Sequence, residues 1–242
     1  MLSNASKYAI IAFLISSIKT IPFAYFFRFY WRVLYYIVLP KIIYNRNGKV
    51  NTFGITGKNP ADLFTWVPYK SYVSPMEIDM YLHKSNSTYF ADLDMARTNL
   101  VCKVLQKTFY NCYDNVTGEF KSKSISNMPF VPVATVQSSF KRELNIFVPF
   151  RVYSRFLAWD KKWVFVISKF VTGSGKTEKI NCISITKYVF KKKGRITIVP
   201  EDMFKECGLL NDYVLAENEK NYRLVSNLSD TTDLEAICNS IN

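Results

Sequence analysis

Residues Asp79–Phe109 read DMYLHKSNSTYFADLDMARTNLVCKVLQKTF, a polar loop that runs into a helical pattern. Within the pattern, apolar side chains recur at spacings of three and four residues: Tyr89, Leu93, Ala96, Leu100 and Val104. That spacing places side chains on one face of an α-helix. Asn86 or Ser87 offers a short polar side chain of the kind that caps a helix amino terminus. We expect one helix of about twenty residues, with an apolar stripe suited to a core.

The chain beyond this helix changes to the period of a β-strand. FRVYSRFLAW (Phe150–Trp159) alternates, and WVFVISKFV (163–171) follows a turn at Asp160, which predicts a hairpin. Residues 131–144, 182–190 and 195–199 indicate further strands, and a short extended segment, 71–78, precedes the helix. One strand, one long helix and several antiparallel strands predict an α+β fold in which the sheet packs on the helix.

Composition narrows the classes of partner. The 242 residues are 49% hydrophobic, enough for one well-filled domain. Lysine and arginine number 32 against 19 acidic residues, so we expect a partner with negative charge. No nucleic-acid-binding module is recognisable, and we expect no nucleic-acid partner. The five cysteines, of which Cys238 is the last, are scattered and do not suggest a disulfide framework. The chain has a single histidine, His83, and no pattern of residues typical of a metal site.

The first forty residues have the composition of a membrane anchor. Residues 8–39 are almost wholly apolar and aromatic, and their only charges are Lys19, Arg28 and Arg32. Two geometries remain open. Either residues 9–27 form a span in which Lys19 reaches back to the interface, or a short insertion ends near Pro22 and the next helix lies in the interface. The flanking positive charges favour a cytosolic position for the remainder, at the endoplasmic reticulum or the mitochondrial outer membrane.

These patterns divide the chain into four parts. We expect a membrane anchor over residues 1–40, a connector over 41–70, the folded domain over 71–215 and a polar tail over 216–242. The basic composition makes an anionic membrane surface one expected partner of this arrangement.

Residues 79–97 resemble the signature of the hotdog-fold acyl-CoA thioesterases, in the branch that includes 4-hydroxybenzoyl-CoA thioesterase. The residues at the corresponding spacings are Asp79, His83, Asn86, Tyr89 and Arg97. FKREL (Phe140–Leu144) and RFLAWDKKWVFVISKF (Arg155–Phe170) resemble the membrane-anchored group called thioesterase superfamily member six. The resemblance covers about residues 72–210. It implies a hotdog fold, an antiparallel sheet wrapped around one long central helix, and a homodimer that hydrolyses acyl-CoA.

The resemblance also implies a chemistry. Backbone N–H groups at the amino end of the central helix would polarise the thioester carbonyl. Asp79 would attack that carbonyl or deprotonate a water, and both routes stay open. His83 and Asn86 would organise the loop, and Asp92 on the helix is a second candidate carboxylate. Basic side chains would offset the phosphates of coenzyme A, which enters as part of the substrate with no separate cofactor: Lys84, Arg142, Arg151 and Arg155.

Two departures from the signature support an alternative. Leu82 stands where the family has glycine before the histidine, and Ser85 stands where it has the first of two asparagines. A fold does not fix a function, so a non-catalytic acyl-binding, lipid-binding or scaffold protein on the same fold is the competing hypothesis. A dehydratase on this fold is a third, weaker one.

Overall fold

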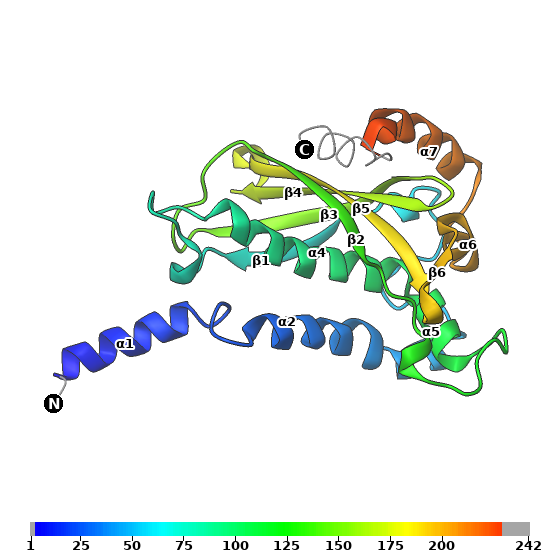
Figure 1. The fold of residues 1–242 in the computed structure, drawn as a ribbon, viewed down its shortest axis with the longest axis horizontal. Helices are drawn as coiled ribbons and strands as arrows, with labels where there is room; N and C mark the ends of the chain where they lie inside the picture. Colours follow the sequence, from blue (N-terminus) through cyan, green and yellow to red (C-terminus); the bar gives the residue numbers. More distant parts are fainter. Residues whose placement is uncertain (1–2, 229–242) are drawn as a thin grey trace, which may run out of the picture.

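The central feature of the computed structural model, which describes residues 3–228, is an antiparallel sheet curled around one long helix (Figure 1). The strands run in the order β1-β3-β4-β5-β2, and β6 pairs with the far end of β5. Their bounds are β1 Val67–Tyr72, β2 Val133–Phe140, β3 Pro149–Trp159, β4 Trp163–Thr172, β5 Lys179–Lys192 and β6 Ile196–Ile198. The helices are α1 Asn4–Ser16, α2 Ala24–Val33, α3 Lys41–Arg46, α4 Tyr89–Val104, α5 Gln106–Asp114, α6 Pro200–Glu206 and α7 Asp212–Val225. This is the predicted α+β hotdog architecture.

Helix α4 lies inside the curl of the sheet, and its predicted apolar stripe is buried. Leu93, Ala96 and Leu100 have no exposed surface. The helix is shorter than expected because Leu105 leaves helical geometry, after which α5 continues in a new direction. The predicted cap is wrong: a 3-10 turn, Asn86–Thr88, precedes α4, and no side chain caps the α4 amino terminus.

The strands follow the predicted alternation. The β3–β4 hairpin turns at Asp160, whose carboxylate accepts the backbone N–H groups of Lys162 and Trp163 at 2.7 and 2.6 Å. Together with the backbone bond from the Asp160 N–H to the Trp163 carbonyl, 2.9 Å, these two bonds stabilise the turn. On the inner face of the sheet, paired hydroxyls such as those of Ser154 and Ser168, 2.7 Å apart, satisfy polar groups that face the core.

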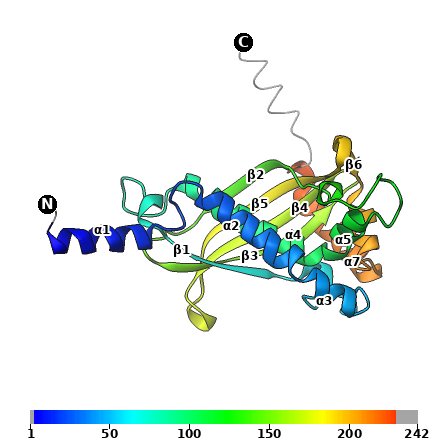
Figure 2. The ribbon, with the colours of Figure 1, turned by 90° about the horizontal axis from the view of Figure 1, so that it is seen from below.

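The N-terminal segment differs from the expected anchor. Figure 2 shows α2 lying across α4, on the side away from the sheet, with α1 projecting past the end of the domain. A single helix over 9–27 is wrong, because α1 ends at Ser16 and α2 begins at Ala24 after turns that place Phe23 at a φ of 65°. Over residues 3–228, we find no helix with the length and apolar character needed to cross a bilayer. Lys19 does not snorkel, since it is buried in the domain.

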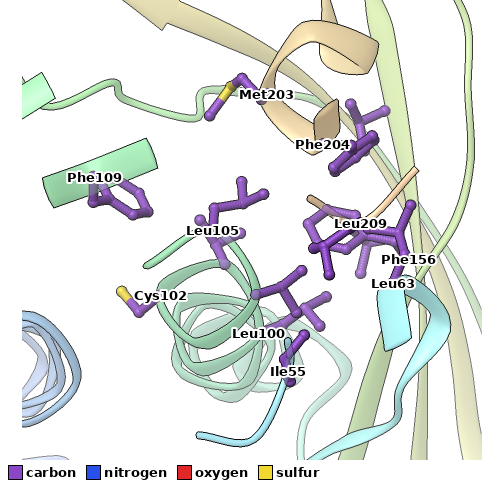
Figure 3. Close-up of a cluster of buried hydrophobic side chains, with 14 of the residues drawn as sticks. Ile55, Leu63, Leu100, Cys102, Leu105, Phe109, Phe156, Met203, Phe204 and Leu209 are labelled. Carbon is purple, nitrogen blue, oxygen red and sulfur yellow. The ribbon is translucent and has the colours of Figure 1, made fainter. Parts of the chain in front are cut away.

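The segment expected as a polar connector contributes to the main core. Leu63 and Phe64 pack with Phe156 of β3 and Phe204 of α6, as the labelled side chains of Figure 3 show for three of the four. Helix α7 packs on β3 at the same end of the domain as α6 (Figure 1) and continues past residue 216, where the polar tail was expected to begin. The remainder of that predicted tail, residues 229–242 with Cys238, lies outside the described residues.

Candidate active site

The loop from Asp79 to His83 is a tight turn. The Leu82 N–H donates to the Asp79 carbonyl, and the Asp79 N–H donates to the His83 carbonyl, both at 3.0 Å. The Asp79 carboxylate also accepts the Tyr81 N–H at 2.9 Å, which fixes the orientation of the acid. Leu82 has a φ of 63°. Glycine enters that region freely, whereas another L-residue incurs roughly 1–2 kcal/mol, so the turn keeps the backbone conformation that a glycine would favour.

His83 lies between two carboxylates. Its Nδ1 is 3.6 Å from Asp79 Oδ2, and its Nε2 is 3.7 Å from Glu143 Oε1. The imidazole stacks on the Tyr81 ring, with the ring centroids 5.8 Å apart. Backbone pairing holds this loop against the segment after β2, since the Lys84 N–H donates to the Leu144 carbonyl at 2.7 Å. The structure therefore brings Asp79 and His83 together in the turn that precedes α4.

Asp92 lies in a buried ion cluster, which we define as Lys19, Arg28, Glu77, Lys84 and Asp92. Its carboxylate is 2.9 Å from Lys84 Nζ, 3.2 Å from Lys19 Nζ and 2.8 Å from Arg28 Nη2. Glu77 is 2.7 Å from Lys19 and 3.1 Å from Lys84. The cluster joins three separate parts of the chain: the N-terminal segment, the loop before α4 and the first turn of α4 itself.

The cluster fixes the charge of Asp92. Burial by itself raises the pKa of a carboxyl group, but Lys84, Lys19 and Arg28 outweigh it and lower the pKa of Asp92 to about 2. The side chain has no exposed surface. An enclosed carboxylate held by three cations is suited to fixing α4 in position, and it is poorly placed to take a proton from water.

The other predicted site residues are spread over the domain. Asn86 is exposed at the start of the 3-10 turn. Lys84, predicted to meet a phosphate, is instead buried in the ion cluster. Arg142 is exposed beside Glu143, and its Nη1 donates to the Ile180 carbonyl at 3.1 Å.

Two predicted phosphate contacts lie on the outer face of the sheet. Arg151 donates to the Gly173 carbonyl and pairs with Glu178 at 3.4 Å. The Arg155 guanidinium lies over the Phe64 and Trp66 rings, 5.9 and 5.1 Å from their centroids. Of the four predicted residues, Lys84 follows His83 in the loop but has its ammonium buried in the ion cluster, and the exposed Arg142 precedes Glu143, which contacts His83.

A cavity of about 740 Å³ lies between α2 and α4. Its apolar lining comes from both helices, from residues 125–133 and from β5, with Phe29, Val33 and Val101 among the contributors. Asp94 and Arg97 form its polar wall, where they make the predicted ion pair. The cavity therefore follows α4 from Asp94, in its second turn, toward its carboxyl end.

The sequence did not predict that Glu77, Glu143 and Lys19 belong to the site. One signal for Lys19 was present, because a charge within an apolar segment must find a partner when it is buried. Glu77 lies two residues before Asp79 but carries no distinctive pattern. Within residues 3–228, no group of three His, Cys, Asp or Glu side chains is arranged to hold a metal ion.

Comparison with known proteins shows which family the sequence matches. The model of the thioesterase-like superfamily matches residues 73–206. A probable thioesterase of Saccharomyces cerevisiae is 38% identical over 215 residues, covering 89% of this chain and 85% of that protein. A thioesterase of Purpureocillium lilacinum is 40% identical over 146 residues, covering 57% of this chain and 47% of that protein.

Solved structures are more distant. A probable thioesterase from Escherichia coli has a TM-score of 0.44 at 12% identity, covering 59% of this chain and 97% of its own. A 4-hydroxybenzoyl-CoA thioesterase variant complexed with 4-hydroxybenzoyl-CoA has a TM-score of 0.43 at 14% identity, covering 59% of this chain and 98% of its own.

Proposed function

Because the chain belongs to the thioesterase-like superfamily, we propose that it hydrolyses an acyl-CoA thioester to a free acid and coenzyme A. The identity of 38% to a relative named as a probable thioesterase supports a thioester hydrolase. The observation that carries the proposal within this chain is the Asp79 carboxylate, oriented by a backbone bond and lying beside the His83 imidazole at the entrance to α4.

In the proposed reaction, the thioester carbonyl oxygen lies at the amino end of α4. The 3-10 turn Asn86–Thr88 leads directly into α4, and the Tyr89 N–H donates to the Asn86 carbonyl. The backbone N–H groups offered to an oxyanion are therefore those at the start of this turn, which no side chain caps. Asp79 takes a proton from water, the hydroxide adds to the carbonyl carbon, and the C–S bond breaks to release the thiolate, which takes up a proton. Direct attack by Asp79 would form an anhydride that water then opens, and this route fits the same geometry.

The left-handed backbone of Leu82 favours the enzyme over a non-catalytic binding protein. The main objection to catalysis is that leucine replaces glycine in the turn, yet the turn retains a φ of 63° at this position. His83 and Asp79 consequently remain adjacent.

The test is release of free thiol by the full-length protein from short, long and aromatic acyl-CoAs. Loss of a general base or nucleophile removes about 10²–10⁴-fold of rate, so Asp79→Asn should abolish most turnover. Asp202→Asn, on the exposed surface of α6, is the matched control. Equal turnover by the two variants would contradict the role of Asp79, and acyl-CoA binding without cleavage by the unmodified protein would support the acyl-binding alternative.

We assign the acyl group to the cavity between α2 and α4. Its volume of about 740 Å³ falls within the range typical of small-molecule sites, and its lining is mostly apolar. Because the cavity follows α4, an acyl chain within it could extend from a carbonyl held near the first turns of that helix.

A homodimer is the proposed assembly. Strand β2 is at the edge of the sheet and pairs only with β5 among the described strands, so one row of its backbone N–H and C=O groups can pair with a second copy. Light scattering of the purified protein measures the mass directly. A monomeric mass at working concentration would contradict this assembly.

We further propose that α1 and the outer face of α2 lie in a membrane interface. Large apolar side chains are exposed on both helices, among them Phe13, Ile15, Phe27 and Trp31. Exposed apolar surface of this extent needs a partner. Cytosolic placement at the endoplasmic reticulum or mitochondrial outer membrane is part of the proposal. Fractionation of cells that produce the full chain or a chain without residues 1–16 tests it, and an unchanged membrane fraction for the shorter chain would contradict the role of α1.

A further inference from the structure

A second pocket, of about 470 Å³, lies between α2 and β1, and its mostly apolar walls include basic side chains. Its walls come from the turns at 17–23, from α2 and from residues 69–72 of β1. Four positively charged residues line it: Lys19, Arg28, Arg32 and Lys70. Tyr69, Ser71 and Tyr72 also line the pocket, and the hydroxyl groups of Tyr69 and Ser71 donate to Asp92 of the ion cluster.

The charges around this pocket do not balance. Lys70 is exposed and lies opposite Arg151 in the β1–β3 register, so its charge is left out of the balance. Lys19, Arg28, Arg32 and the adjacent Lys84 make four positive groups, whereas the adjoining carboxylates are Glu77 and Asp92. Those two acids are engaged by Lys19, Lys84 and Arg28 at 2.7–3.2 Å. Over residues 3–228, neither Arg32 nor Lys70 has a carboxylate within salt-bridge distance. The pocket thus carries an excess of positive charge.

Arg32 is the group that most needs an anion. Its guanidinium stacks on the Tyr69 ring, 4.7 Å from the centroid, and Nη1 donates to the Arg28 carbonyl at 3.1 Å. Its Nε is buried and has no hydrogen-bond partner in the described structure. A buried donor on a charged group is costly to leave unpaired, and a phosphate oxygen is its natural acceptor.

The rim of the pocket indicates where the phosphate comes from. Ile18, Ile21 and Phe27 line the pocket and are exposed on the same segment as the apolar surface of α1. A lipid phosphate has acyl chains beside it that such a rim would contact, whereas a free phosphate has none. We propose that this pocket binds the phosphate head group of an anionic phospholipid, an inference that rests on the proposed membrane association.

The first test is flotation of the full chain with vesicles of phosphatidylcholine alone or mixed with phosphatidic acid. Hydrogen bonds to charged groups contribute about 1.5–3 kcal/mol, so Arg32→Gln should lower affinity for the anionic vesicles about tenfold or more. Arg223→Gln removes an exposed arginine of α7 and is the matched control for net charge. Thermal unfolding of both variants verifies that they are folded. An equal loss of vesicle affinity in the two variants would contradict phosphate binding in this pocket.

The second test needs no membrane. Calorimetric titration with a soluble short-chain phosphatidic acid should show saturable binding to the unmodified protein and to Arg223→Gln, and at least tenfold weaker binding to Arg32→Gln. If the protein binds neither vesicle type but binds the short-chain lipid with the expected loss in Arg32→Gln, the proposed membrane association is wrong and phosphate binding in the pocket is supported. Displacement of the short-chain lipid by equimolar coenzyme A or inorganic phosphate would overturn the lipid assignment.

Discussion

The Lys19 ammonium lies 3.2 Å from the Asp92 carboxylate, although the two residues are 73 positions apart in the chain. This contact, together with that of Arg28, makes the segment between α1 and α2 part of the folded domain. Two charges that an apolar sequence assigns to a membrane interface are therefore structural ions of a protein core. The position of α4, and with it the entrance loop of Asp79, depends on them.

Truncation should reveal this dependence. A chain that begins at Leu39 loses both Lys19 and Arg28 and leaves Asp92 with Lys84, whereas a chain that lacks residues 1–16 keeps the whole ion cluster. Removing partners from a buried ion pair destabilises by about 3–5 kcal/mol. Urea unfolding should show a loss of more than this size for the first truncation, because it also removes the packing of α2 on α4, and little change for the second. Equal stability of the two would mean that the cluster contributes little.

Acid should weaken the domain through Asp92. Its pKa is lowered to about 2 in the folded state from an ordinary value of 3.8. A depressed pKa contributes stability that is present above the unfolded value and is lost as pH falls through the folded value. The contribution, about 2 kcal/mol, should disappear between about pH 4 and pH 2.

Urea unfolding of the unmodified protein and of Asp92→Asn over that pH range measures the effect. The variant should be less stable at neutral pH and should show a flatter decline toward acid. Asp202→Asn on the exposed surface of α6 should follow the unmodified protein. A decline of the same steepness in Asp92→Asn would show that other carboxyl groups cause the acid sensitivity.

Local periodicity was sufficient to predict most of α4 and the strands from β2 onward. The first strand was misplaced, because β1 is Val67–Tyr72 and a 3-10 turn, Pro75–Glu77, occupies part of the segment expected to be extended, 71–78. The stripe of Leu93, Ala96 and Leu100 and the alternation in β3 are properties of neighbouring residues, and the fold retains them. The break at Leu105 and the missing side-chain cap arise from packing around the helix ends, which local spacing does not encode.

The sequence did not predict the position of the N-terminal segment or part of the site, because both depend on contacts between residues that are distant in the chain. An apolar stretch can be buried either in lipid or against protein. Here Lys19 binds Glu77 and Asp92, which lie far along the chain, and these contacts hold the segment against the domain. Asp79 and His83 are four residues apart and could be placed in one turn from their spacing, whereas Glu143 reaches His83 only through the fold.

Leu82 offers a test of the turn. Leu82→Gly should relieve roughly 1–2 kcal/mol of backbone strain and lose about 0.4–1 kcal/mol to the freer unfolded chain, so stability should change little. The side chain is 68% exposed, so its loss removes little packing. Leu82→Val places a β-branched residue at a φ of 63° and should lower both stability and thiol release.

Denaturant unfolding and acyl-CoA turnover of the two Leu82 variants provide the comparison. A large gain in turnover for Leu82→Gly would show that leucine distorts the site. Unchanged behaviour of Leu82→Val would show that the turn does not require the left-handed conformation.

Filling the cavity should change acyl selectivity. Val101 lines the cavity from α4, so Val101→Trp would occupy part of its length beyond Asp94 and Arg97. If the acyl chain follows α4, turnover of long acyl-CoAs should fall at least tenfold more than turnover of acetyl-CoA, because only the long chains reach that position. Val116→Trp adds the same side chain at an exposed position and should leave the ratio unchanged. A uniform loss for short and long substrates in Val101→Trp would place the acyl chain outside this cavity, and circular dichroism of the variant distinguishes that result from misfolding.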